Sequence, residues 1–136
     1  MSLADLGRRA VACKHWRWMP GMLLLWKLHE RGGTYKGRVC HLGCSDSGAG
    51  KDVYCEGRGD RFDGVLEVPK CFPDLSDPAT LGCLLHLVRE AWGVERAVVW
   101  WNEHDQGWVA DVRPRNFVFV RDSEAHALVA ALEAAP

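Results

Sequence analysis

The sequence predicts an α+β fold in which three amphipathic helices pack against a mainly antiparallel sheet. Apolar residues recur at helical spacing in three segments, and short β-branched or aromatic runs lie between those segments. Short polar turns join consecutive runs, which favours antiparallel pairing. The predicted order is α-β-β-(β)-α-β-β-β-α. A chain of 136 residues has the size of one domain, so we expect 1–136 to form a single domain.

The first predicted helix begins after Ser2, which can cap it together with Asp5 in a loose capping box. One face of this helix is apolar and consists of Leu3, Leu6, Ala10 and Cys13. We expect the helix to end near Lys14, because the Pro20-Gly21 pair follows and the intervening residues have no helical period.

The apolar run 22–28 and the partly alternating run 34–42 predict a pair of strands joined by a glycine-containing turn. Shorter strands are compatible with 53–55 and 65–68. Most polar and glycine residues of this half lie in 29–64. We therefore expect 29–64 to be a variable, partly irregular and insertion-like segment.

The second helix has clear signals at both ends. Asp77 suits the N-cap, and Pro78 suits the first helical position, where a missing N–H costs nothing. Gly93 is a natural left-handed terminator. The apolar face between them consists of Leu81, Leu84, Leu85, Val88 and Trp92. These features predict a helix that buries one face.

Three strands and a last helix complete the chain. The predicted strands are 97–101, 107–112 and 116–120, and short polar loops connect them as a meander. Ser123 can cap the last helix. Its apolar stripe consists of Ala125, Leu128, Val129 and Leu132.

Charge and hydropathy exclude two classes of partner. The chain has 17 basic and 18 acidic residues and a formal net charge of -1, which argues against binding duplex nucleic acid. Its most apolar stretch, 19–26, is far too short to span a bilayer, so we expect no membrane partner. The first residues show no cleavable signal pattern, which favours a cytoplasmic location and reduced cysteines.

The best candidate for a ligand site is the segment after the first helix, with the residues Lys14, His15, Trp16, Arg17 and Trp18. In an extended segment the two indoles and Lys14 point to one side. Indole faces stack on bases and nearby cations pair with phosphates, so the segment could hold a nucleotide-type ligand. The alternative interpretation is that both indoles anchor the core.

A glycine-rich stretch, 43–52, contains Lys51 and invites comparison with a phosphate-binding P-loop. The motif fails, because Ser45 occupies a required glycine position and Asp52 follows the lysine where Ser or Thr binds magnesium. The stretch is either a looser anion-binding nest that includes Lys51 or an ordinary polar loop.

Four of the six cysteines could supply zinc ligands, namely Cys40, Cys44, Cys55 and Cys71. Their spacing forms one loose pair and two isolated residues, whereas structural zinc sites usually have two tight pairs. The alternative is that the thiols are buried as small apolar groups. The prediction is therefore of no metal and no cofactor, with zinc as an alternative.

Three tryptophans of the second half form a candidate interaction surface: Trp100, Trp101 and Trp108. Adjacent residues of a strand point to opposite faces, so one indole of the Trp100-Trp101 pair belongs to the core and the other is covered or exposed. Exposed indoles indicate an interface. The chain has 7 tryptophans, more than a core of this size hides comfortably, so we expect a homo-oligomer.

Three places in the sequence carry a resemblance to a family. They are the Trp-rich turn 16–21, the segment 73–84 and the closing helix 124–132. In these places the chain resembles small proteins of tailed phages and prophages, including those described as phage ABA sandwich domain proteins. The resemblance implies a phage origin and a sandwich of helices and sheet, and it implies no activity.

From these observations we expect a phage-encoded accessory binding protein that acts in the host cytoplasm. It would antagonise host defence by sequestering a small nucleotide-type signal or by blocking a host protein. We name no catalytic residue, because no common hydrolase motif is present. The alternatives are a small hydrolytic enzyme that uses a histidine or cysteine of 29–64, and a zinc-stabilised structural or interaction protein of the phage.

Overall fold

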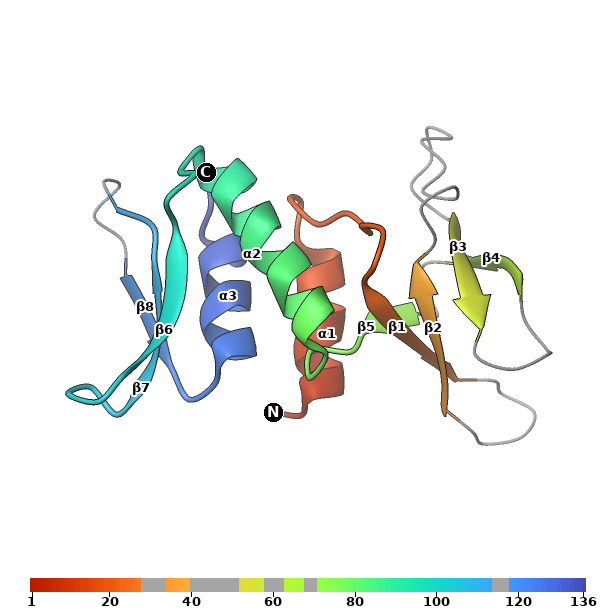
Figure 1. The fold of residues 1–136 in the computed structure, drawn as a ribbon, viewed down its shortest axis with the longest axis horizontal. Coiled ribbons are helices and arrows are strands. Elements are labelled where there is room, and N and C mark those ends of the chain that lie inside the picture. The colour runs from red at the N-terminus through yellow and green to blue at the C-terminus, as the bar shows by residue number, and fades with distance from the viewer. Residues whose placement is uncertain (28–33, 40–51, 58–62, 68–70, 114–117) are drawn as a thin grey trace.

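A computed structural model describes residues 1–27, 34–39, 52–57, 63–67, 71–113 and 118–136. Within these ranges the chain forms three helices and eight strands. The helices lie between two antiparallel sheets (Figure 1). The predicted α+β class and the order of elements are confirmed. The division into two sheets is new, because the sequence patterns give no indication of which strands pair over long distances.

The larger sheet has the strand order β4-β3-β2-β1-β5, and every neighbouring pair is antiparallel. Its strands are β1 (Leu23–Lys27), β2 (Thr34–Val39), β3 (Asp52–Gly57), β4 (Asp63–Glu67) and β5 (Cys71–Pro73). The four strands expected from the sequence are therefore present. The sequence did not predict β5, because three residues that include a proline show no alternation and form only a short edge strand.

The smaller sheet consists of β6 (Val98–Asn102), β7 (Gly107–Asp111) and β8 (Val118–Arg121), in the order β6-β7-β8. These strands correspond to the three strands expected between the second helix and the last one. Helix α3 contacts all three strands of this sheet. The smaller sheet is thus covered on one face by the last helix of the chain.

The helices are α1 (Leu3–Ala12), α2 (Pro78–Trp92) and α3 (Glu124–Glu133), and their N-caps are the predicted Ser2, Asp77 and Ser123. Each cap side chain accepts a hydrogen bond from a backbone N–H of the first turn. Gly93 ends α2 with a φ of 64°, as expected of a left-handed terminator. No helix in the described part of the chain is long and apolar enough to cross a membrane.

One buried cluster connects the helices with both sheets. It includes Leu6 from α1, Leu24 from β1, Leu84 from α2, Ala110 from β7 and Leu128 from α3, all at most 1% exposed. Burial of this apolar surface is the main source of stability.

The indole of Trp92 adds a polar link between two helices. Its Nε1 donates to the carbonyl oxygen of Ala131 at 2.8 Å. Ala131 belongs to the last turn of α3, where carbonyls lack partners within the helix. The indole of Trp92 therefore packs in the core and also gives the carbonyl oxygen of Ala131 on α3 a hydrogen-bond donor.

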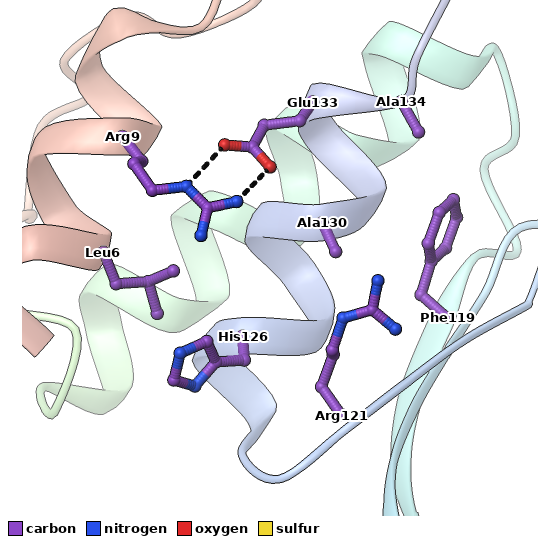
Figure 2. Close-up of a pocket in the computed structure, with 8 residues that line it drawn as sticks. All are labelled: Leu6, Arg9, Phe119, Arg121, His126, Ala130, Glu133 and Ala134. Carbon is purple, nitrogen blue, oxygen red and sulfur yellow. Dashed lines mark hydrogen bonds and ion pairs between the residues drawn. The ribbon is translucent and has the colours of Figure 1, made fainter. Parts of the chain in front are cut away.

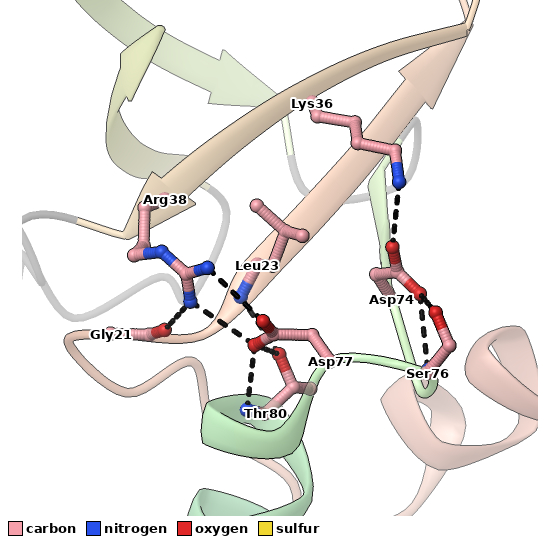
Figure 3. A network of polar contacts seen from close by, with 8 residues as sticks. All are labelled: Gly21, Leu23, Lys36, Arg38, Asp74, Ser76, Asp77 and Thr80. Carbon is pink, nitrogen blue, oxygen red and sulfur yellow. Dashed lines mark hydrogen bonds and ion pairs between the residues drawn. The ribbon is translucent and has the colours of Figure 1, made fainter. Parts of the chain in front are cut away.

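A polar network fastens the start of α2 to the larger sheet (Figure 3). The hydroxyl of Thr80 accepts from the backbone N–H of Leu23 at 2.8 Å and donates to Asp77 at the same distance. The buried carboxylate of Asp74 accepts from the ammonium of Lys36 on β2 at 3.0 Å. These bonds fix the position of α2 relative to β1 and β2.

Candidate functional site

The smaller sheet has one covered and one open face. Val99, Ala110 and Phe119 belong to the covered face and pack in or against the core. Alternation along each strand sends their neighbours to the opposite side, where no described helix lies (Figure 1). We call this side the outer face, and its residues are Val98, Trp100, Val109, Asp111, Val118 and Val120.

The outer face is apolar and exposed. Val98 is 44%, Trp100 37%, Val118 49% and Val120 38% exposed, whereas Val109 is only 2% exposed. In the register of the sheet, Val109 lies between Trp100 and Val120. Side chains that are opposite each other on neighbouring strands are in contact range, so the exposed groups form one patch. A contiguous apolar patch on a protein surface marks an interaction site more often than scattered apolar residues do.

The outer face carries no net charge. Its charged member, Asp111, accepts hydrogen bonds from the backbone N–H of Arg113 at 2.9 Å and from the Nε of Arg113 at 2.7 Å. A further guanidinium nitrogen of Arg113 contacts the same carboxylate. These bonds lower the pKa of Asp111 below its ordinary value. The ion pair lies within the chain, so a partner of the outer face need not supply a cation.

The three predicted interaction tryptophans lie on two faces. Trp100 belongs to the outer face. Trp108 is half-buried on the covered side and packs against the core. Trp101 is 46% exposed and contacts Trp108 edge to face, with 6.2 Å between the ring centroids. Trp101, Trp108 and Arg121 are in register across the sheet, so Trp101 lies on the same side as α3. The expectation that one indole of the Trp100-Trp101 pair belongs to the core is therefore wrong, because Trp101 lies near the end of β6 and stays exposed although it is on the covered side.

Sequence reasoning missed the valines that surround Trp100. The signal was present, because the run Val118-Phe119-Val120 is apolar at every position instead of alternating with polar residues. Strands with this composition are typical of sheets that are covered on both faces. In the described part of the chain only one face of the smaller sheet is covered, which leaves the apolar outer face open.

The predicted ligand-binding segment after α1 is not a strand. Trp16 and Trp18 are half-buried, pack against the core and meet edge to face, with 5.4 Å between their ring centroids. The guanidinium of Arg17 pairs with both carboxylate oxygens of Glu90 on α2. The interpretation of the two indoles as core anchors accounts for these contacts.

Three further residues were predicted to bind the ligand, and the described ones do not lie with the two indoles in one site. The Nε2 of His15 is 2.9 Å from the carbonyl oxygen of Pro136, and Lys14 is exposed. Lys51 lies outside the described residues. The nucleotide-binding hypothesis for this segment therefore stays a prediction.

The zinc hypothesis concerns residues that are mostly not described. Cys71 is buried in β5, Cys40 and Cys44 lie outside the described ranges, and Cys55 is described in its backbone alone. Among the side chains that are described, no group of three or more His, Cys, Asp or Glu could hold a metal ion. The alternative of a hydrolase that uses 29–64 falls mainly on the same undescribed residues. Both alternatives stay predictions.

Comparisons with known proteins give no relative. No protein-family model, no curated protein and no solved structure matches the chain. The resemblance to phage proteins therefore stays a prediction from the sequence.

Proposed function

We propose that the protein works by binding another protein through the outer face of the smaller sheet. The observation that carries this proposal is the exposure of four apolar side chains, Val98, Trp100, Val118 and Val120, on one open face. Burying such side chains against a partner is favourable by roughly 25 cal/mol for each Å² removed from water. Trp is also among the residues that contribute most to protein interfaces.

The chemistry of the outer face favours a protein partner over other ligand classes. A nucleic acid requires cations that contact its phosphates, and Arg113, the cation that the described residues place beside the outer face, is already paired with Asp111. A small molecule requires a concave site, and an open sheet face is not concave. An uncharged apolar surface on another protein meets neither obstacle.

The area of the outer face is large enough for the centre of a protein interface but not for a whole one. Three strands of about five residues cover roughly 15 Å by 16 Å, which is about 240 Å². Stable interfaces bury about 800 Å² on each partner. The outer face would therefore supply the apolar centre around Trp100, and polar residues around the sheet would complete the contact.

Of the two modes of action that the sequence suggests, blocking a protein is the one that the outer face supports. The phage origin, the role against host defence, the host cytoplasm and the homo-oligomer stay predictions that rest on the sequence. A second copy of the chain is one of the partners that the following experiment identifies.

A photo-crosslinking amino acid placed at Val120 tests the proposal in the cells from which the gene comes. Leu3 is the matched control, because it is an exposed apolar residue at 43% exposure on α1, away from the outer face. We expect the probe at Val120, but not the probe at Leu3, to form an adduct with one defined protein. Adding Trp100→Ser should abolish the adduct.

Each outcome of this experiment bears on the proposal. An adduct between two copies of the chain would identify the partner as a second copy and would confirm the predicted homo-oligomer. The proposal is wrong if probes at Val98, Val118 and Val120 form no adduct. It is equally wrong if Leu3 gives the same adducts as Val120.

A further inference from the structure

A groove of about 320 Å³ lies over α3, between α1 and β8 (Figure 2). It is separate from the outer face, because Phe119 and Arg121 project from the covered side of β8. Its apolar lining includes Leu6, Phe119 and Ala130. The volume is at the lower end of the range for small-molecule sites.

One wall of the groove is closed by an ion pair whose charges cancel. The Nε of Arg9 donates to Glu133 at 3.0 Å, and a terminal nitrogen of Arg9 donates to the other carboxylate oxygen at 2.6 Å. The hydrogen bonds to Glu133 raise the pKa of Arg9. Glu133 therefore adds no uncompensated negative charge to the groove.

Arg121 supplies an uncompensated positive charge. Its guanidinium donates to the backbone carbonyl oxygen of Val120 at 2.6 Å, and no carboxylate in the described part of the chain pairs with it. In Figure 2 its side chain extends beside Ala130 on the opposite side of α3 from the Arg9–Glu133 pair. A guanidinium has five donors in a planar fork, so several of them are available to an anion.

His126 lies on the first turn of α3 and also lines the groove. Its Nδ1 is 2.8 Å from the hydroxyl of Ser123, which also accepts from the backbone N–H of His126 at 3.2 Å. This contact orients the imidazole. The Nε2 makes no hydrogen bond to any described residue, so it can bind a ligand.

We propose that the groove binds a small organic phosphate, with the phosphate on Arg121 and the organic part on the apolar lining and His126. The proposal is independent of the outer face and of its protein partner. It combines a cavity, a cation without a counter-charge, an oriented imidazole and an apolar wall. The ligand class includes nucleotides, and this site differs from the segment 14–18 that the sequence favoured.

A titration followed by NMR of the isotope-labelled protein tests the groove. The probes are phenyl phosphate and adenosine monophosphate. Inorganic phosphate represents the phosphate group alone, and benzyl alcohol represents the organic part alone. We expect saturable shifts in residues of the groove, with a dissociation constant below about 1 mM for at least one organic phosphate. Each half alone should bind at least about tenfold more weakly, because it makes only part of the contacts.

Two arginine variants separate the site from general charge effects. Arg121→Gln should weaken binding by about tenfold or more, since it removes a charge-assisted contact. Arg96→Gln is the matched control, because Arg96 is an exposed arginine that does not line the groove, and its variant should bind as the wild type does. The spectrum of each variant reports whether it is folded.

Three results would overturn the inference. The first is the absence of saturable shifts with both organic phosphates. The second is unchanged binding by a folded Arg121→Gln variant. The third is equal affinity for inorganic phosphate and for the organic phosphates, because the apolar lining would then play no part.

Discussion

The guanidinium of Arg38 on β2 holds both carboxylate oxygens of Asp77, the N-cap of α2, with two hydrogen bonds of 3.1 Å (Figure 3). The same carboxylate accepts from the backbone N–H of Thr80 at 2.9 Å. A nitrogen of Arg38 also donates to the carbonyl oxygen of Gly21 at 2.7 Å. The side chain of Asp77 thus caps α2 and, through Arg38, joins α2 to the larger sheet.

Substitutions of Asp77 should separate these two roles. Asp77→Ala removes the cap and the ion pair, and we expect it to lower the free energy of unfolding by about 2 kcal/mol. Asp77→Asn keeps a capping side chain and loses the charge, so we expect a smaller loss of about 1 kcal/mol. Urea denaturation measures both. Equal losses in the two variants would show that capping contributes nothing here.

Acid should destabilise the fold through the same carboxylate. The hydrogen bonds from Arg38 hold the pKa of Asp77 below its ordinary value of 3.8. In the unfolded chain Asp77 takes up its proton at a higher pH than in the folded chain, so acid favours unfolding. We expect this contribution to be complete above about pH 4 and to be lost as the pH falls towards the folded pKa.

Denaturation in urea at a series of pH values checks this expectation. The wild type should lose stability steadily below about pH 4, and Asp77→Asn should lose less over the same range. The pair of Asp111 with Arg113 contributes in the same direction and remains in both proteins. Parallel curves for the two proteins would contradict the assignment to Asp77.

Two helical glycines should respond oppositely to alanine. A Cβ at Gly7 would lie 3.0 Å from the backbone oxygen of Pro73, so α1 would have to move away from β5. A Cβ at Gly82 in α2 would have nothing within 4 Å. We expect Gly82→Ala to stabilise the protein by about 0.5–1 kcal/mol through helix propensity. Gly7→Ala should instead destabilise it by about 1 kcal/mol through overpacking.

Thermal unfolding of the two glycine variants under identical conditions gives the comparison. The melting temperature should rise for Gly82→Ala and fall for Gly7→Ala. A rise in both would mean that α1 can move away from Pro73 without loss.

Local signals in the sequence predicted the elements well, because caps and periods act over a few residues. Asp77-Pro78 and Gly93 mark both ends of α2, and the structure has them there. The two-sheet arrangement depends on pairings such as Leu24 with Pro73, which lie far apart in the chain and leave no local pattern. Topology was therefore less predictable than secondary structure.

The candidate sites were also hard to predict, because they combine residues that lie far apart in the chain. Exposure of one indole of the Trp100-Trp101 pair was one of the outcomes expected from the sequence, but the patch around Trp100 exists because β8 lies next to β7. The groove at Arg121 and His126 combines α1, α3 and β8, so no single segment signals it. Trp16 and Trp18 lie in a segment that is not a strand, and both indoles pack against the core and meet edge to face, which their spacing alone did not reveal.

A pair of valine-to-threonine substitutions tests whether other parts of the chain cover the outer face. Val118 is 49% exposed on the outer face, and Val112 is 0% exposed in the core. Threonine has nearly the shape of valine but adds a hydroxyl. We expect Val112→Thr to cost about 2 kcal/mol, because the hydroxyl is buried. Val118→Thr should change stability by less than about 0.5 kcal/mol, as at other exposed positions.

Urea denaturation measures the free energy of unfolding of both variants. The photo-crosslinking probe at Val120 measures whether Val118→Thr also weakens binding to the partner. A Val118→Thr protein that is as stable as the wild type but forms less adduct would show that the outer face serves a partner and not the fold. A loss of stability as large as that of Val112→Thr would mean that the chain itself covers Val118. The outer face would then be part of the core, and the proposed binding function would lose its surface.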